Sequence, residues 1–282
     1  MTKTITRSTR AAIILSLLTS GSQAVARDSC SRDWLCVDAK EGRDHVEIYV
    51  ENLKPYPLTI SLRASTRNLE PPGRQTITET VSGGDRKLIL RMDQVDSSRD
   101  WHYRYWYDWT IGSLDVKHDD KHLYRFPYAS GNSYYVLQGF GSRFSHTGLE
   151  EFAVDFHMPV GTPIHAARGG TVVQVVEEHL RGCWEDGCGK YANFIVILHS
   201  DGSTGEYYHL KNDGSYVQPG DHVTQGQLIG LSGNTGHTTM PHLHFAVYEA
   251  VAWGNTRSIP IRFNSAKGVV SRPRRGGRYI AD

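Results

Sequence analysis

The chain has 282 residues, of which 39% are hydrophobic and 22% are charged. This composition suits a folded protein with room for two modest cores and excludes disordered and fibrous classes. The 31 basic and 30 acidic residues give a formal net charge of +1, so nothing in the overall balance indicates a nucleic-acid partner.

Residues 1–26 have the pattern of a cleaved signal peptide. Lys3, Arg7 and Arg10 precede a short apolar run, and the segment ends in small residues at Ala24-Val25-Ala26. The run is far shorter than the roughly 20 apolar residues that a membrane-spanning helix needs. We therefore expect cleavage after Ala26, a periplasmic or secreted protein and no stable membrane span. Loss of three basic residues would leave 28 basic and 30 acidic residues, a net charge of about −2.

The four cysteines form two pairs that are close in sequence, Cys30 with Cys36 and Cys183 with Cys188. In an oxidising compartment this spacing favours two short-loop disulfides. A structural zinc site is the alternative, but the spacings differ from the usual two-residue gap.

A first all-β domain is expected over residues 27–125. Polar and apolar residues alternate in HVEIYVEN, PLTISLRAS, RQTITETV, RKLILRM and WHYRYWYDW, with turn residues such as Pro71-Pro72-Gly73 between the runs. Strands that recur every dozen or so residues indicate an immunoglobulin-like β-sandwich. We interpret it as an accessory domain without chemistry of its own.

A linker follows, and the domain boundary should lie between about 115 and 132. His118 and His122 stand four apart beside two aspartates, as in a helical metal site. Because no apolar periodicity supports a helix there, we favour a solvated charged loop.

A second all-β domain is expected over residues 133–264. It has strand-like runs such as TVVQVVEE, NFIVILHS, GEYYHL and HLHFAVYE, separated by glycine clusters. Residues 265–282 then form a basic C-terminal tail, because seven basic residues and one acid occur from Arg257 onward. A solvated tail is the favoured interpretation, and an anion-binding element is the alternative.

His242 and His244 are the strongest chemical signal. Two histidines that are two apart in a strand project from the same face. Zinc prefers imidazole and carboxylate ligands in a tetrahedral arrangement, and a catalytic site keeps one position open. An HxH pair alone is weak evidence for a metal site, since histidines on the surface of a sheet often bind nothing.

Residues from about 137 to 262 resemble the lysostaphin-type M23 zinc metallopeptidases. The segments that carry the resemblance are SHTGLEEFAVDFHMPVGTPIHAARGGTV, YANFIVILHSDG, YYHL, VQPGDHVTQGQLIGLSGNTGHTTMPHLHF and IPIRF. The resemblance implies a lysostaphin-like antiparallel β-sheet domain, Zn2+ held by His146, Asp155 and His244, and catalytic histidines at His209 and His242.

The first segment departs from the family spacing H-x-x-x-D, because eight residues separate His146 from Asp155. Glu150 stands at the usual offset and is the alternative ligand. Counted back from the turn at Gly161, however, Asp155 occupies the family position, and we favour it because the rigid strand and turn determine where the carboxylate lies. Met240 replaces the usual glycine before PHLHF and should touch the groove wall.

The function implied is hydrolysis of peptide cross-links in bacterial peptidoglycan, with zinc activating water near neutral pH. We assign transition-state stabilisation mainly to His209 and proton transfer to His242, a division that could be reversed. Tyr207, Tyr208 and Tyr248 are expected to wall the groove, and the D-alanine to diaminopimelate link is the specific bond expected. A non-catalytic cell-wall binder that activates another hydrolase and a secreted bacteriolytic protease with another target are the alternatives.

Overall fold

The computed structural model describes residues 29–70 and 76–282, so the expected signal peptide lies outside the described residues. The described chain divides into two compact units, residues 29–114 with 250–255, and residues 115–249 with 256–282. Both units are built from β-strands, and two short 3-10 helices are the only helices among the described residues. The expectation of an all-β protein is confirmed. Within the described ranges, no helix has the length and apolarity needed to cross a bilayer.

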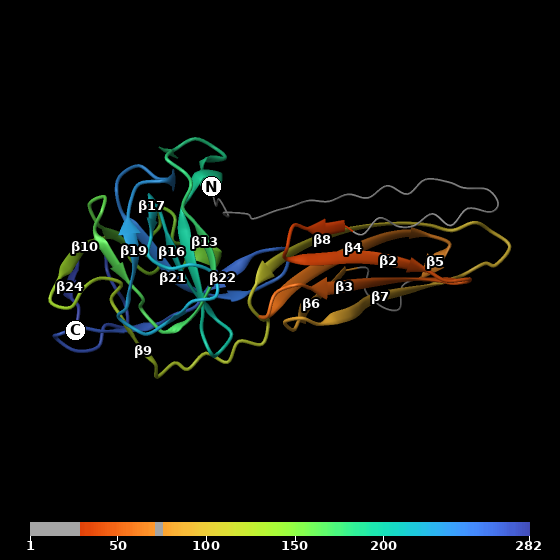
Figure 1. The fold of residues 1–282 in the computed structure, drawn as a ribbon, viewed down its shortest axis with the longest axis horizontal. Coiled ribbons are helices and arrows are strands. Elements are labelled where there is room, and N and C mark those ends of the chain that lie inside the picture. The colour runs from red at the N-terminus through yellow and green to blue at the C-terminus, as the bar shows by residue number, and fades with distance from the viewer. Residues whose placement is uncertain (1–28, 71–75) are drawn as a thin grey trace. The chain divides into compact units, whose positions relative to one another are not determined.

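The first unit contains two antiparallel sheets (Figure 1). One sheet has the order β1 (Ser29–Ser31), β2 (Leu35–Glu41), β3 (His45–Asn52), β7 (Arg86–Gln94), β5 (Leu69–Glu70). The other has the order β6 (Thr76–Val81), β4 (Leu58–Arg67), β8 (His102–Ile111). Val46, Ile48 and Val50 of β3 are buried while the residues between them are half-buried, as the alternating sequence predicts.

The second unit is organised around a nine-stranded sheet that joins segments far apart in sequence (Figure 1). Its main path runs β18 (His222–Val223), β13 (Gly170–Val176), β15 (Phe194–Leu198), β16 (Thr204–Tyr208), β21 (Leu243–Ala250), β11 (Val154–His157), β10 (Ser133–Gln138), β24 (Arg278–Ile280), and β22 (Thr256–Ser258) pairs with β21. The pairings in this sheet that place the site, β10 with β11, β11 with β21, and β16 with β21, are all antiparallel.

Three smaller sheets and the helices complete the second unit. The first sheet has the order β12 (Pro163–His165), β19 (Leu228–Ser232), β17 (Leu210–Ser215). The other two sheets pair β14 (Gly182–Cys183) with β20 (Gly236–His237), and β23 (Arg262–Asn264) with β9 (Leu123–Arg125). The 3-10 helices are η1 (Gly148–Glu150) and η2 (Cys188–Tyr191).

The two faces of the large sheet have different roles. Leu243, Phe245 and Val247 of β21 are fully buried in the apolar core. Because side chains alternate along a strand, His244 and Tyr248 project from the opposite face. The core on one face thus fixes the position of the polar side chains on the other.

The end of the chain is part of this unit. A basic tail is expected over residues 265–282, but in the structure the last strand of this segment, β24, pairs with β10 at the edge of the large sheet. Ala281 is buried in the core, and the backbone of Pro273 packs so closely on Gly139 that a Cβ there would lie 2.0 Å from its carbonyl oxygen. The segment therefore supports the loop that follows β10.

Both expected disulfides are present, Cys30–Cys36 and Cys183–Cys188. All four cysteines are paired, so the alternative of a cysteine zinc site is wrong. A disulfide closing a short loop stabilises mainly by restricting the unfolded chain.

Phe245→Ala is expected to destabilise the second unit by about 3–5 kcal/mol, because it removes a fully buried ring and leaves a cavity. The Phe245 ring centroid lies 4.9 Å from that of Tyr207, directly across the β16 and β21 pair. Urea unfolding followed by tryptophan fluorescence measures the change. Val160→Ala, at an exposed turn, is the control and should change stability by less than about 0.5 kcal/mol.

Candidate metal centre

Three of the residues singled out from the sequence, His146, Asp155 and His244, converge in the second unit. One ligand atom from each lies within 4.8 Å of the others. Asp155 Oδ1 is 3.2 Å from His146 Nε2 and 2.9 Å from His244 Nδ1. These separations match neighbouring ligands around an ion with bond lengths of about 2 Å.

Strand register brings two of the three together. Asp155 of β11 lies directly opposite His244 of β21, so their side chains are neighbours on one face of the sheet. His146 comes from the loop between β10 and η1, where its backbone N–H donates to the Ser142 carbonyl over 3.0 Å. The extra residues between His146 and Asp155, compared with the family spacing, therefore lie in this loop and in η1.

The arrangement fits a divalent metal because one nitrogen has no other partner. His146 is 1% exposed, and its Nε2 makes no hydrogen bond within the described residues. Its Nδ1 faces the Gly139 carbonyl at 3.3 Å, which fixes Nδ1 as the donor and leaves the Nε2 lone pair directed at Asp155. A buried polar atom without a partner is costly, and a cation at this point would satisfy it.

Charges within the cluster shift the pKa values of Asp155 and His244. Burial alone would raise the pKa of Asp155, but the nearby histidines His146 and His242 outweigh it and hold that pKa well below its ordinary value. For His244 burial acts to lower the pKa, and the hydrogen bond and charge of Asp155 outweigh it, so the pKa is raised. The carboxylate is thus ionised and available as a ligand.

Two hydrogen bonds orient the carboxylate and its loop. Gln138 Nε2 donates to Asp155 Oδ2 over 2.6 Å and to Ser145 Oγ over 2.8 Å. Gln138 thereby links the strand that carries it to both the carboxylate and the residue before His146. Nothing in the sequence marks this residue as functional, because a glutamine at a strand end carries no distinctive signal.

His209 and His242 lie together beside the cluster, with ring centroids 4.5 Å apart. His209 follows the last residue of β16 and has φ of 68°, a left-handed conformation that is unfavourable for a residue with a side chain. His242 Nε2 is 3.9 Å from Asp155 Oδ1. All five histidine and aspartate residues named from the sequence are therefore in one site.

The imidazole rings of His209 and His242 have the same tautomer when they are neutral. His209 Nδ1 lies 2.7 Å from the Thr235 carbonyl, and His242 Nδ1 lies 2.8 Å from the Met240 carbonyl. A carbonyl oxygen only accepts, so each Nδ1 carries the proton and each Nε2 is a lone pair. Burial, together with His242 and His244, holds the pKa of His209 well below its ordinary value, so this ring stays neutral.

The expected tyrosine wall is wrong for Tyr207. Its side chain is fully buried in the core, and its hydroxyl accepts from the Ala167 N–H over 2.7 Å. Tyr208 and Tyr248 lie on the opposite face of the sheet, where their hydroxyls donate to Glu206 and Glu150 over 2.7 and 2.6 Å. Because strand residues alternate, adjacent tyrosines cannot line the same wall.

His118 and His122 lie outside this site and on no helix. His118 Nδ1 is 3.3 Å from Asp201, which also binds Arg168, and the His122 ring packs edge-on against Tyr124. Both histidines are half-buried, whereas Asp119, Asp120 and Lys121 between them are exposed, as expected of a solvated charged loop.

His199 is a buried histidine with a structural setting. Burial is the main cause that lowers its pKa to about 4, and its Nδ1 lies 2.9 Å from the Gly169 carbonyl. Between pH 6.5 and about 4 the unfolded chain takes up a proton that the folded chain does not. The free energy of unfolding should therefore fall as the pH drops through this window, by roughly 3 kcal/mol from this residue.

The measurement is urea unfolding at several pH values for the wild type and His199→Asn, with the Asn variant of exposed His222 as the matched control. A shallower pH slope in His199→Asn alone is expected. Equal slopes would mean that His199 takes up its proton in the folded protein.

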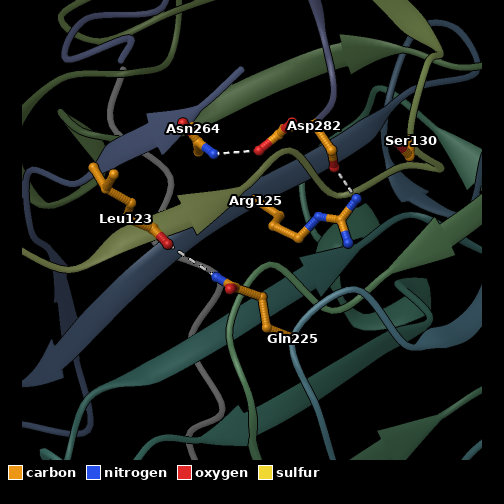
Figure 2. A pocket seen from close by; sticks show the side chains of 6 residues that line it. All are labelled: Leu123, Arg125, Ser130, Gln225, Asn264 and Asp282. Carbon is orange, nitrogen blue, oxygen red and sulfur yellow. Dashed lines mark hydrogen bonds between the residues drawn. The ribbon is translucent and has the colours of Figure 1, made fainter. Parts of the chain in front are cut away.

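A separate pocket is lined by Leu123, Arg125, Ser130, Gln225, Asn264 and Asp282 (Figure 2). The Arg125 guanidinium donates to the backbone oxygen of Asp282, and Asn264 Nδ2 donates to the Asp282 carboxylate. The positively charged side chain in this pocket, Arg125, is therefore already hydrogen-bonded to Asp282. The pocket shares no residue with the histidine cluster.

A buried cluster of two histidines and one carboxylate, with two further histidines alongside, has the residue types that metal-dependent hydrolases use. The family model for Peptidase family M23 matches residues 150–258, a range that includes Asp155, His209, His242 and His244. The chain carries a peptidase family M23 domain, and the resemblance seen in the sequence is confirmed. His146 precedes the matched range, and geometry places it in the site.

Named relatives are similar to part of the chain. Peptidoglycan DD-endopeptidase ShyA of Vibrio cholerae is 40% identical over 91 residues, which are 32% of this chain and 18% of ShyA. Glycyl-glycine endopeptidase ALE-1 of Staphylococcus capitis is 35% identical over 122 residues, 43% of this chain and 31% of ALE-1. The catalytic domain of lysostaphin from Staphylococcus simulans is 30% identical over 45% of this chain and 87% of that structure, with a TM-score of 0.32. The chain spans less than a third of the length of the first two relatives.

Proposed function

We propose that this protein is a zinc metalloendopeptidase that hydrolyses the peptide cross-links of bacterial peptidoglycan. The observation that carries the proposal is the convergence of His146 Nε2, Asp155 Oδ1 and His244 Nδ1, with the first of these buried and otherwise unbonded. Three protein ligands would leave a fourth position for water or substrate, as a catalytic zinc site requires. The names of ShyA and ALE-1 support a cell-wall peptide as the substrate.

Zinc bound here would supply Lewis acidity, polarising a peptide carbonyl and lowering the pKa of a water ligand. The neutral His209 and His242 both present an Nε2 lone pair, so either can accept the proton released from the attacking water. Burial and the neighbouring histidines lower the pKa of His209 and so make it a weak base, which leaves His242 as the proposed first acceptor, as expected from the sequence. The neutral His209 would accept a hydrogen bond from the attacking water at its Nε2 lone pair, and His242, once protonated at Nε2 by that water, would pass the proton to the leaving amine.

The setting of the enzyme is also part of the proposal. Two disulfides support an oxidising compartment, either the periplasm or the exterior, consistent with a leader over residues 1–26. For a periplasmic enzyme the bond between D-alanine and diaminopimelate is the specific target proposed. We further propose an accessory immunoglobulin-like sandwich over residues 27–125, a peptidase domain over residues 133–264 and a basic segment over residues 265–282.

Incubation of purified sacculi with the protein, with and without a chelator, tests the proposal. Release of muropeptides that stops with the chelator and returns with zinc is the expected result. Mass spectrometry of the released fragments identifies the bond. Binding to sacculi without release at any zinc concentration would instead favour a non-catalytic cell-wall protein.

A further inference from the structure

Glu150 lies behind His244, away from the atoms that converge on Asp155. Tyr248 stands between them: its hydroxyl donates to Glu150 Oε2 over 2.6 Å, and His244 Nε2 lies 3.1 Å from the same hydroxyl. Glu150 Oε2 is itself 3.7 Å from His244 Nε2, beyond hydrogen-bonding distance. The three groups thus form a chain from a carboxylate through a phenol to an imidazole.

The direction of the hydrogen bonds in this chain follows from the number of protons. A phenol has one proton, and an ionised carboxylate can only accept, so the Tyr248 proton is donated to Glu150. The phenol oxygen is then an acceptor, and His244 must donate to it from Nε2. A neutral His244 with its proton on Nε2 has its lone pair on Nδ1, the atom 2.9 Å from Asp155 Oδ1.

We infer that Glu150 and Tyr248 are positioning residues that fix His244 as a ligand through Nδ1 and so strengthen zinc binding. The inference rests on the proposed function for its metal, and it gives Glu150 a role other than that of a ligand. Partners of this kind orient the ring of a ligating histidine and make it a better donor to the metal.

The three hydrogen-bonded groups come from two elements of the fold, β21 and η1. Tyr248 and His244 are four residues apart on β21, on the same face, and Tyr248 is 3% exposed. Glu150 is the last residue of η1, which follows the loop that carries His146. The Glu150 to Tyr248 bond therefore also ties the His146 loop to the strand that carries His244.

Tyr248→Phe tests the inference, because it removes the hydroxyl and keeps the ring. Zinc affinity, measured by competition with a chromophoric chelator, is expected to weaken about 10- to 100-fold. In the zinc-loaded protein the His244 Nε2–H should exchange slowly with solvent in the wild type and faster in the variant, as observed by nitrogen-15 NMR. A purely structural tyrosine would leave that proton unchanged.

Two Glu150 variants separate the effect of the carboxylate charge from the effect of the hydrogen bond that Glu150 accepts from Tyr248. Glu150→Gln keeps an amide oxygen that can accept from Tyr248, so its loss of affinity should be smaller than that of Glu150→Ala. Tyr128→Phe is the matched control, since it also removes a buried hydroxyl, one bonded to the Tyr279 carbonyl over 2.7 Å, in the same unit. It should leave zinc affinity unchanged.

The outcomes distinguish the inference from the proposed function. A wild-type protein that binds no zinc would overturn both. A wild-type protein that binds zinc, with Tyr248→Phe equal to it in affinity and in Nε2–H exchange, would overturn only the role of Tyr248 and Glu150. Zinc that is retained in Asp155→Ala and lost in Glu150→Gln would make Glu150 a ligand and would also contradict the inference.

Discussion

Asp155→Ala is expected to lose stoichiometric zinc, with affinity reduced by more than about 100-fold, because loss of a mere supporting residue already costs 10- to 100-fold. The carboxylate is the only anion among these ligand atoms, and its Oδ1 lies 3.2 Å from His146 Nε2 and 2.9 Å from His244 Nδ1. Without it, the two histidines His146 and His244 would be left with no carboxylate between them. Zinc content after gel filtration, measured by mass spectrometry, decides the point.

Two further proteins control this experiment. Asp100→Ala removes an exposed carboxylate from the other unit and should bind zinc as the wild type does. Glu150→Gln should still bind one zinc per chain at saturating metal. Stoichiometric zinc in Asp155→Ala would show that the third ligand lies elsewhere.

His209→Ala is expected to keep zinc and to lose about 10²-fold or more in turnover, because the attacking water would lose the acceptor that positions it. Its Nε2 lone pair faces the site, its Nδ1 is committed to Thr235, and its backbone is held at φ of 68°. The residue is therefore built into the site without belonging to the three-ligand group. Release of muropeptides per mole of zinc-loaded protein gives the rate.

The matched control is His157→Ala, an exposed histidine at the end of β11 in the same unit. It should keep both zinc and turnover. If His209→Ala lost zinc together with activity, His209 would be a ligand and the proposed division between ligands and the histidines that act on the attacking water would fail.

Much of this site could be predicted because strand periodicity is a local property. In HLHFAVYE the alternate residues Leu243, Phe245 and Val247 are buried, so the other face must carry His244 and Tyr248. The same reasoning rules out a shared wall for Tyr207 and Tyr208, so the expectation that both line the groove conflicts with the strand pattern itself. Register with β11 then decides that Asp155 meets His244.

The remaining parts depend on contacts that sequence spacing does not encode. Glu150 and Tyr248 are 98 residues apart, and Gln138 reaches Asp155 across a register shift between β10 and β11. The carbonyls of Thr235 and Met240 fix the tautomers of two histidines, although backbone groups carry no sequence signature. Such supporting interactions require coordinates.

The most direct test is an anomalous difference map at the zinc edge from crystals of the zinc-loaded protein. The account predicts one peak about 2 Å from His146 Nε2, Asp155 and His244 Nδ1, with Glu150 outside the coordination shell. A peak bound through Glu150, or a metal that leaves His146 uncoordinated, would contradict it.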